Sequence, residues 1–166
     1  MPPAPNLWHQ DFEYRLESWL RRHCTPKHGT KVYHNVNVAP SGGWSQDYRI
    51  PDLVLIGPSS RAVEKEDHVE GPPDVVIEIR SPGDETIEKL PFYAALGVPE
   101  VWVLDRDTRV PTVYVLKEGD YKAKSPGAQG LLASDVVGVE LRSAGPGRLC
   151  IRLTGDDASR EEIAPN

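Results

Sequence analysis

Two acidic residues interrupt apolar segments of this sequence, and their chemistry is the natural starting point. Asp52 follows Ile50-Pro51 and precedes the apolar run 53–56, and Glu78 lies inside the apolar segment 74–80. Burying a carboxylate without a partner costs several kcal/mol, so two such acids need a compensating charge. Hard cations such as Mg²⁺ bind carboxylate oxygens together with waters. The pair therefore predicts a site for Mg²⁺ (or Mn²⁺) that could activate a water against a phosphate.

A cationic side chain near the acids would complete such a site, and the sequence offers two. Arg80 follows Glu78 by two positions, and the period of a strand puts both side chains on one face. Lys89 lies on the next expected helix, which can aim it at the acids or away from them. Arginine can hold a phosphate but cannot accept a proton. The alternative is a structural ion pair in which Asp52 or Glu78 faces solvent at a strand end.

The first expected helix carries three more residues that could reach a cation. His9 stands near its start and could face the cation site, whereas an exposed polar residue is the alternative interpretation. Glu13 and Glu17 are one turn apart and could add a ligand. A solvated helix face is the simpler interpretation for these two glutamates.

Periodicity, caps and breakers predict the elements that must position these residues. The first is a helix over 6–24, capped by Asn6 and ended by Pro26. Strands are expected over 31–39, 46–56 and 74–80, with a polar loop over 57–73, then a helix over 84–96 that Pro91 should kink or delay and Gly97 should cap. Further strands are expected over 100–105 and 112–116, with weaker segments around 121–123, 136–141 and 149–153.

This order of a helix, three strands, a helix and further strands predicts a mixed α/β sheet. A chain of 166 residues suits one domain, expected over 1–155, followed by a flexible acidic tail over 156–166. No apolar run approaches the ~20 residues that cross a bilayer, and no secretory signal is visible, so a cytoplasmic protein without membrane association is expected. Cys24 and Cys150 are predicted to be reduced structural thiols.

The net charge of −6 argues against nonspecific coating of nucleic acid, which depends on Lys and Arg. Positive charge nevertheless gathers near the N-terminus, in Arg15, Arg21, Arg22, Lys27 and Lys31 with His23 and His28. These residues could form the footprint of a DNA site, or they could simply be a solvated helix end. Because nucleotide-binding and dinucleotide motifs are absent from the sequence, no small-molecule organic cofactor is expected.

Ile50-Pro51-Asp52 followed by Glu78-Ile79-Arg80 resembles the PD-(D/E)XK nuclease pattern, with Arg in the usual place of Lys. More specifically, residues 51–116 resemble the Uma-two family of restriction endonuclease-like proteins. The likeness is carried by Pro51-Asp52-Leu-Val, Val76-Ile-Glu-Ile-Arg-Ser-Pro82, Glu88-Lys89-Leu90, Tyr93 and Gly97-Val-Pro-Glu-Val-Trp-Val-Leu-Asp105. The resemblance implies a restriction-endonuclease-like core in which Asp52 and Glu78 bind metal. It also implies that Arg80, Lys89 or both provide the catalytic cation.

The resulting hypothesis is a metal-dependent DNA endonuclease that hydrolyses phosphodiester bonds with a metal-activated water. Symmetric cutting of both strands would require a homodimer. The alternative is a catalytically inactive binding or interaction module with a nuclease fold. The acidic net charge, the arginine at position 80 and the absence of a recognisable target-recognition domain in the sequence favour this second hypothesis.

Overall fold

The first element of the fold is a long helix whose ends are set by two residues. In the computed structural model, which describes residues 6–165, α1 (Leu7–His28) begins at Asn6, whose side chain accepts the His9 N–H at 3.0 Å. It ends at Gly29, which has a φ of 68°. Pro26 was expected to end the helix but lies in its last turn, where a missing N–H costs only one hydrogen bond. The left-handed glycine, rather than the proline, therefore terminates α1.

The central sheet has six strands in the order β1-β3-β6-β7-β8-β9. They are β1 (Lys31–His34), β3 (Leu53–Ile56), β6 (Val75–Arg80), β7 (Glu100–Asp105), β8 (Pro111–Lys117) and β9 (Asp120–Ala123). β6 and β7 are parallel and the other neighbours are antiparallel. The 3-10 turn η1 (Ile87–Lys89) and α2 (Leu90–Leu96), which ends at Gly97, connect the parallel pair. The predicted mixed α/β fold is confirmed, and the second helix starts late, as Pro91 led us to expect.

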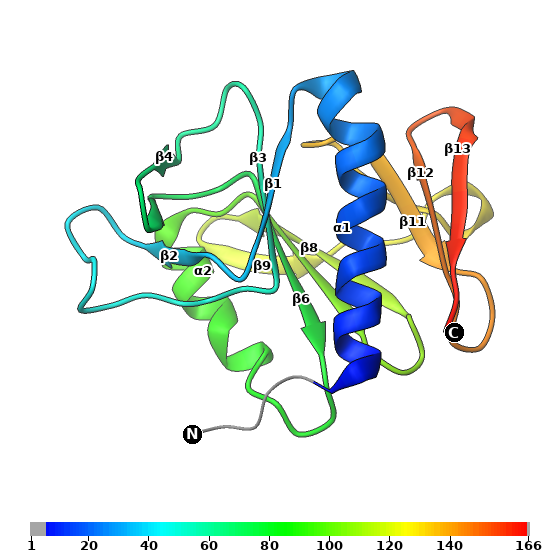
Figure 1. Cartoon of the computed structure of the whole chain (residues 1–166), viewed down its shortest axis with the longest axis horizontal. Helices are drawn as coiled ribbons and strands as arrows, with labels where there is room; N and C mark the ends of the chain where they lie inside the picture. Colours follow the sequence, from blue (N-terminus) through cyan, green and yellow to red (C-terminus); the bar gives the residue numbers. More distant parts are fainter. Residues whose placement is uncertain (1–5, 166) are drawn as a thin grey trace.

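The two helices pack on opposite sides of β6. Val75, Ile77 and Ile79 belong to a core that includes Phe12, Leu16 and Trp19 of α1, whereas Val76 packs in a second core with Tyr93 of α2. Because successive strand residues face opposite sides, Glu78 points to the side of α2. Figure 1 shows α1 lying across the sheet, with its N-terminal end next to the end of β6. The strand end that carries the acids is thus flanked by both helices.

A small sheet forms where one long strand and a loop were expected. β2 (Asn37–Ala39) pairs in parallel with β5 (His68–Glu70), which pairs with β4 (Val63–Glu64). The chain leaves the central sheet between β1 and β2 because Asn35 adopts a left-handed φ of 47°. The predicted loop 57–73 therefore contains two strands, and only 53–56 of the predicted strand 46–56 is extended in the central sheet. These short polar strands lack the apolar alternation by which strands are recognised in sequence.

The C-terminal strands form a four-stranded antiparallel sheet that packs beside α1 (Figure 1). It contains β10 (Leu132–Ser134), β11 (Val139–Ser143), β12 (Leu149–Leu153) and β13 (Asp156–Ile163), and the 3-10 turn η2 (Ala128–Gly130) precedes it. In place of the flexible tail expected over 156–166, β13 pairs with β12, and the Ser159 carbonyl accepts the Trp19 indole N–H at 3.1 Å. The acidic residues of β13 face solvent while Ser159 and Ile163 are buried. The acidic composition of this segment therefore led to the prediction of a tail where the chain forms a strand.

Both cysteines are buried and free, as predicted. Between residues 6 and 165, no helix has the length and apolar character needed to cross a membrane.

The burial of Ile163 gives a direct test of β13. We expect Ile163→Ala to lower the free energy of unfolding by about 2–4 kcal/mol, because the side chain is 1% exposed and its loss leaves a cavity. The exposed neighbour Glu162 is the control. Glu162→Ala should change the free energy of unfolding by no more than about 0.5 kcal/mol. Urea unfolding followed by tryptophan fluorescence measures both, and equal, small effects would show that the segment is a flexible tail.

Candidate active site

Asp52 and Glu78 lie at the same end of two neighbouring strands. β3 and β6 are antiparallel with Leu53 opposite Ile77, and extending this register by one residue puts Asp52 opposite Glu78. The Asp52 Oδ2 atom accepts the Ile79 backbone N–H at 2.6 Å, which fixes the carboxylate against β6. Residues directly opposite each other on antiparallel strands have Cβ atoms about 4.5–5.5 Å apart. The structure thus brings together the two acids that the sequence singled out.

Glu78 is almost completely buried and is held from two sides. Its Oε2 atom accepts a hydrogen bond from Lys89 Nζ at 2.8 Å, and its Oε1 atom accepts one from the Tyr93 hydroxyl at 2.6 Å. Burial raises the pKa of Glu78 from 4.5 to about 7; the charge of Asp52 adds to this rise, and Lys89 opposes it. Burial and Glu78 both raise the pKa of the Tyr93 phenol, so Tyr93 stays protonated and donates to the carboxylate. One lysine does not fully compensate the buried negative charge.

The two candidate cations differ sharply in position. Lys89 lies at the end of η1 and reaches Glu78, and its side chain is 28% exposed, so it also faces the open side of the site. Arg80 is the last residue of β6 and is exposed. Its guanidinium makes no hydrogen bond or ion pair with any residue of the described chain. Of the two cations, Lys89 is therefore the one that contacts an acid of the site.

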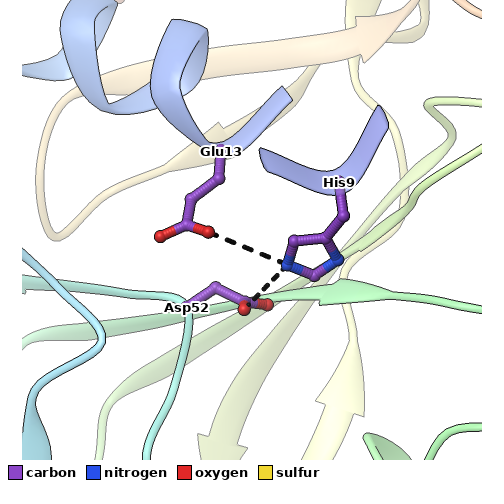
Figure 2. Close-up of side chains that lie close together, drawn as sticks. All are labelled: His9, Glu13 and Asp52. Carbon is purple, nitrogen blue, oxygen red and sulfur yellow. Dashed lines mark hydrogen bonds and ion pairs between the residues drawn. The ribbon is translucent and has the colours of Figure 1, made fainter. Parts of the chain in front are cut away.

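The first turns of α1 bring two further groups to Asp52. As Figure 2 shows, His9 Nε2 lies 3.0 Å from Asp52 Oδ1 and 3.8 Å from Glu13 Oε2. His9 and Glu13 are each 7% exposed, so His9 faces the acids rather than solvent, and the interpretation of Glu13 as part of a solvated helix face was wrong. The hydrogen bond to Asp52 raises the pKa of His9, while burial and the nearby Asp52 raise the pKa of Glu13.

The loop after β1 supports this group with a residue that sequence reasoning missed. Asn35 donates its side-chain amide to Glu13 Oε1 at 3.0 Å, and its backbone N–H donates to the Asp52 carbonyl at 3.0 Å. Next to it, the His34 Nδ1 and Glu17 Oε2 atoms are 2.9 Å apart. Nothing in the local sequence marks Asn35 as part of the site, apart from the tendency of asparagine to adopt left-handed turns. Glu17 is 9% exposed, so it too is not on a solvated face.

Four of the five Lys and Arg residues that gather near the N-terminus are in ion pairs with carboxylates. Ion pairs join Arg15 to Asp11, Arg21 to Glu17, Arg22 to Glu161 and Lys31 to Glu64. His23 instead packs against the Trp19 ring. A phosphate at this surface would have to compete with carboxylates, so the interpretation as a paired helix surface describes these residues better than a DNA footprint.

The comparisons with known proteins agree with this fold. A solved structure from Anabaena variabilis ATCC 29413, described as "a putative nuclease belonging to DUF820", is similar to the chain with a TM-score of 0.60 and 16% sequence identity, covering 80% of this chain and 74% of that one. At this identity the likeness shows the fold alone. The Uma2 family, described as "Putative restriction endonuclease", matches residues 1–144. The chain therefore belongs to the Uma2 family, as its motifs indicated, and has the fold of a restriction-endonuclease-like nuclease. The curated proteins contain no match to it.

The raised pKa of Glu78 predicts how stability changes with pH. The folded protein keeps a proton on Glu78 up to about pH 7, whereas the unfolded chain releases it near the ordinary value of 4.5. The proton on Glu78 therefore stabilises the folded protein fully below the unfolded-state pKa of this residue. This stabilisation is lost as the pH rises through the folded-state pKa of Glu78. We expect Glu78→Gln to remove a decline of up to about 3 kcal/mol in the free energy of unfolding between about pH 4.5 and about pH 8.

Urea unfolding in the presence of a chelator measures this difference between parent and variant. Glu88→Gln changes an exposed acid on the same segment and should retain the full decline of the parent. A Glu78→Gln curve that runs parallel to the parent curve at all pH values would contradict the assignment.

Proposed function

We propose that this protein is a metal-dependent DNA endonuclease that hydrolyses phosphodiester bonds with a metal-activated water. The observation that supports it best is the meeting of Asp52 and Glu78 on adjacent strands, with Lys89 bonded to Glu78. An inactive module has no need to keep two acids and a lysine together at a costly, partly buried position. Membership of a family described as restriction endonucleases points in the same direction.

The acids fit a divalent cation such as Mg²⁺ or Mn²⁺. Both offer carboxylate oxygens, which are the ligands that hard cations prefer. The pKa of Glu78 is raised to about 7, which is the signature of a buried carboxylate with too little positive charge nearby. A bound cation would supply that charge, lower the pKa of a water and offset the charge that develops on the phosphate.

The residues around the acids have roles that follow from their contacts. The Ile79 N–H orients Asp52, and the Tyr93 hydroxyl orients Glu78, so both carboxylates are fixed before substrate arrives. Lys89 uses one of its three N–H donors on Glu78 and keeps two for a phosphate oxygen or the attacking water. Arg80 lies at the strand end with a free guanidinium and binds the DNA backbone beside the scissile phosphate.

One such pair of acids is found in the described part of each chain, so symmetric cutting of both DNA strands would use a homodimer. The two chains would have to present their sites to opposite strands. A protein that acts as a monomer would instead release nicked circles from a supercoiled plasmid.

The activity depends first on the two acids. We expect Asp52→Asn and Glu78→Gln to lower the rate of plasmid nicking at least about 100-fold, because losing a ligand removes several kcal/mol of stabilisation of the transition state. The measurement is conversion of supercoiled DNA with Mg²⁺ or Mn²⁺, and Glu88→Gln is the matched control with parental activity. A parent protein that binds the cation but nicks no DNA would favour the inactive binding module, and an Asp52→Asn variant as active as the parent would disprove the assigned site.

Substitutions of the two basic side chains, Lys89 and Arg80, should have different effects on kcat and KM. We expect Lys89→Ala to lower kcat on the order of 100-fold with little change in KM, because its interaction matters most in the transition state. Arg80→Ala should instead raise KM several-fold and leave kcat nearly unchanged, as expected for a residue that binds substrate and transition state equally. Initial rates over a range of DNA concentrations measure both variants. The reverse pattern would assign the catalytic role to Arg80.

A further inference from the structure

We propose that a pocket beside Glu100, at the first residue of β7, binds a guanine nucleotide. This pocket is separate from the acids of the candidate active site. β7 runs parallel to β6, with Glu100 beside Val75 and Val103 beside Glu78. Val75 faces the core under α1, whereas Glu78 faces α2, so Glu100 and Glu78 lie on opposite faces of the sheet as well as at different levels along it. The inference goes beyond the nuclease reaction and does not depend on it.

Glu100 is a buried acid with one unpartnered oxygen. The residue is 2% exposed, and its Oε2 atom accepts the Trp102 indole N–H at 3.1 Å. Its Oε1 atom accepts no hydrogen bond from any residue between 6 and 165, and Glu100 lines a pocket of about 540 Å³. A buried carboxylate oxygen without a donor is costly. The pocket therefore favours a ligand that presents N–H donors to Glu100.

The same pocket gathers positive charge, although the whole chain has a net charge of −6. Its acidic lining residues are Glu100 and Asp135, and its basic lining residues are Arg61, Lys117, Lys122 and Lys124. Lys124 is already bonded to Asp135 at 2.8 Å. Lys117 and Lys122 form no hydrogen bond or ion pair with any other residue of the described chain, so their ammonium groups are available to an anion such as phosphate.

The acid and the free lysines are held apart by the sheet. Glu100 pairs with Val115 of β8, and Val115 pairs with Lys122 of β9, so the three side chains share one face. Two strand spacings separate the backbones of Glu100 and Lys122, which is roughly 10 Å. No ion pair forms across this gap in the described chain. A ligand that fits must therefore carry donors at one end and negative charge at the other.

The surface between these charges suits a flat ring. Val115 forms its middle, and Pro99, Leu116 and Val136 also line the pocket. The volume of about 540 Å³ lies within the range of about 300–1,000 Å³ that is usual for small-molecule sites. An aromatic base against the apolar residues, with a phosphate at the lysines, satisfies both ends of the pocket.

The unpartnered carboxylate selects guanine among the bases. Guanine presents a ring N–H and an amino group side by side, and a carboxylate can accept both, because each of its oxygens has two lone pairs. Uracil and thymine have one N–H between two carbonyl oxygens, which Glu100 would repel. Adenine and cytosine offer one amino group beside a ring nitrogen that is itself an acceptor. The 5′ end of a DNA strand can carry the same guanine and phosphate, so the experiment compares both sources.

The test is a calorimetric titration of the full-length protein with guanosine monophosphate (GMP). We expect one GMP to bind per chain, and inosine monophosphate, which lacks the 2-amino group, to bind about 10-fold more weakly. Uridine monophosphate should bind more weakly still. A 5′-phosphorylated DNA trinucleotide that begins with guanine should bind more weakly than GMP. Tighter binding of the trinucleotide would overturn the assignment to a free nucleotide.

Substitutions locate the bound nucleotide. We expect Glu100→Gln to weaken GMP binding at least about 10-fold, and Lys117→Gln or Lys122→Gln to weaken it about 5-fold. Glu118→Gln is the matched control for the acid, because Glu118 is exposed in the turn after Lys117 and does not line the pocket. It should bind GMP within about 2-fold of the parent, since solvent screens an exposed charge. Lys27→Gln, at an exposed position of α1, is the control for the lysines.

Circular dichroism checks that each variant is folded, and the comparison of GMP with inosine monophosphate needs no variant at all. A parent protein that binds neither nucleotide, or binds both equally, would overturn the inference. So would equal affinities in Glu100→Gln and Glu118→Gln. Asp52→Asn should bind GMP as the parent does; a loss of binding in this variant would place the nucleotide at the nuclease site instead. A protein that binds GMP at Glu100 but nicks no DNA would refute the proposed function alone.

Discussion

The carboxylate of Asp52 joins the helical and sheet parts of the site. One oxygen meets His9 of α1 at 3.0 Å, and the other accepts the Ile79 N–H of β6 at 2.6 Å. The backbone carbonyl of the same residue accepts the Asn35 N–H, so a third segment is tied to it. The positions of the first turn of α1, of the loop after β1 and of the end of β6 all depend on this one residue. A change at Asp52 would therefore alter the arrangement of the site as well as its charge.

The site concentrates negative charge where the fold is least able to solvate it. Glu13 and Glu78 both lie near Asp52, and the pKa of each is raised by burial and by the charge of Asp52. Inside the described chain, the Lys89 ammonium bonds directly to Glu78, and the His9 ring bonds to Asp52. Such an arrangement lowers stability near neutral pH, and it is the kind of strain that proteins keep at functional positions. The same excess of charge is what a bound cation would compensate.

Much of this arrangement could be predicted from the sequence, for identifiable reasons. Asp52 and Glu78 stood out because each interrupts an apolar strand, and the motifs from Pro51 to Asp105 indicated the family. Glu13 was misjudged and the position of His9 was left open, because their burial depends on where α1 lies against the sheet, which helical periodicity does not determine. Asn35 left no signal, because its role depends on a left-handed φ between two sheets. The strands β4 and β5 escaped recognition because they are too short to show an apolar alternation, and β13 escaped it because most of its exposed positions carry charged side chains.

The exchange of lysine for arginine in the motif follows from the geometry of the strand end. Position 80 is the last residue of β6 and is exposed, and among the described residues Arg80 forms no hydrogen bond or ion pair with Glu78. Lys89 reaches Glu78 from the turn before α2, and α2 is held against the sheet by Tyr93 and ended by Gly97. A helix-borne lysine removes the need for a cation that contacts Glu78 from position 80. The strand position is then free to carry an arginine, whose planar guanidinium is better suited to binding a phosphate backbone than to transferring a proton.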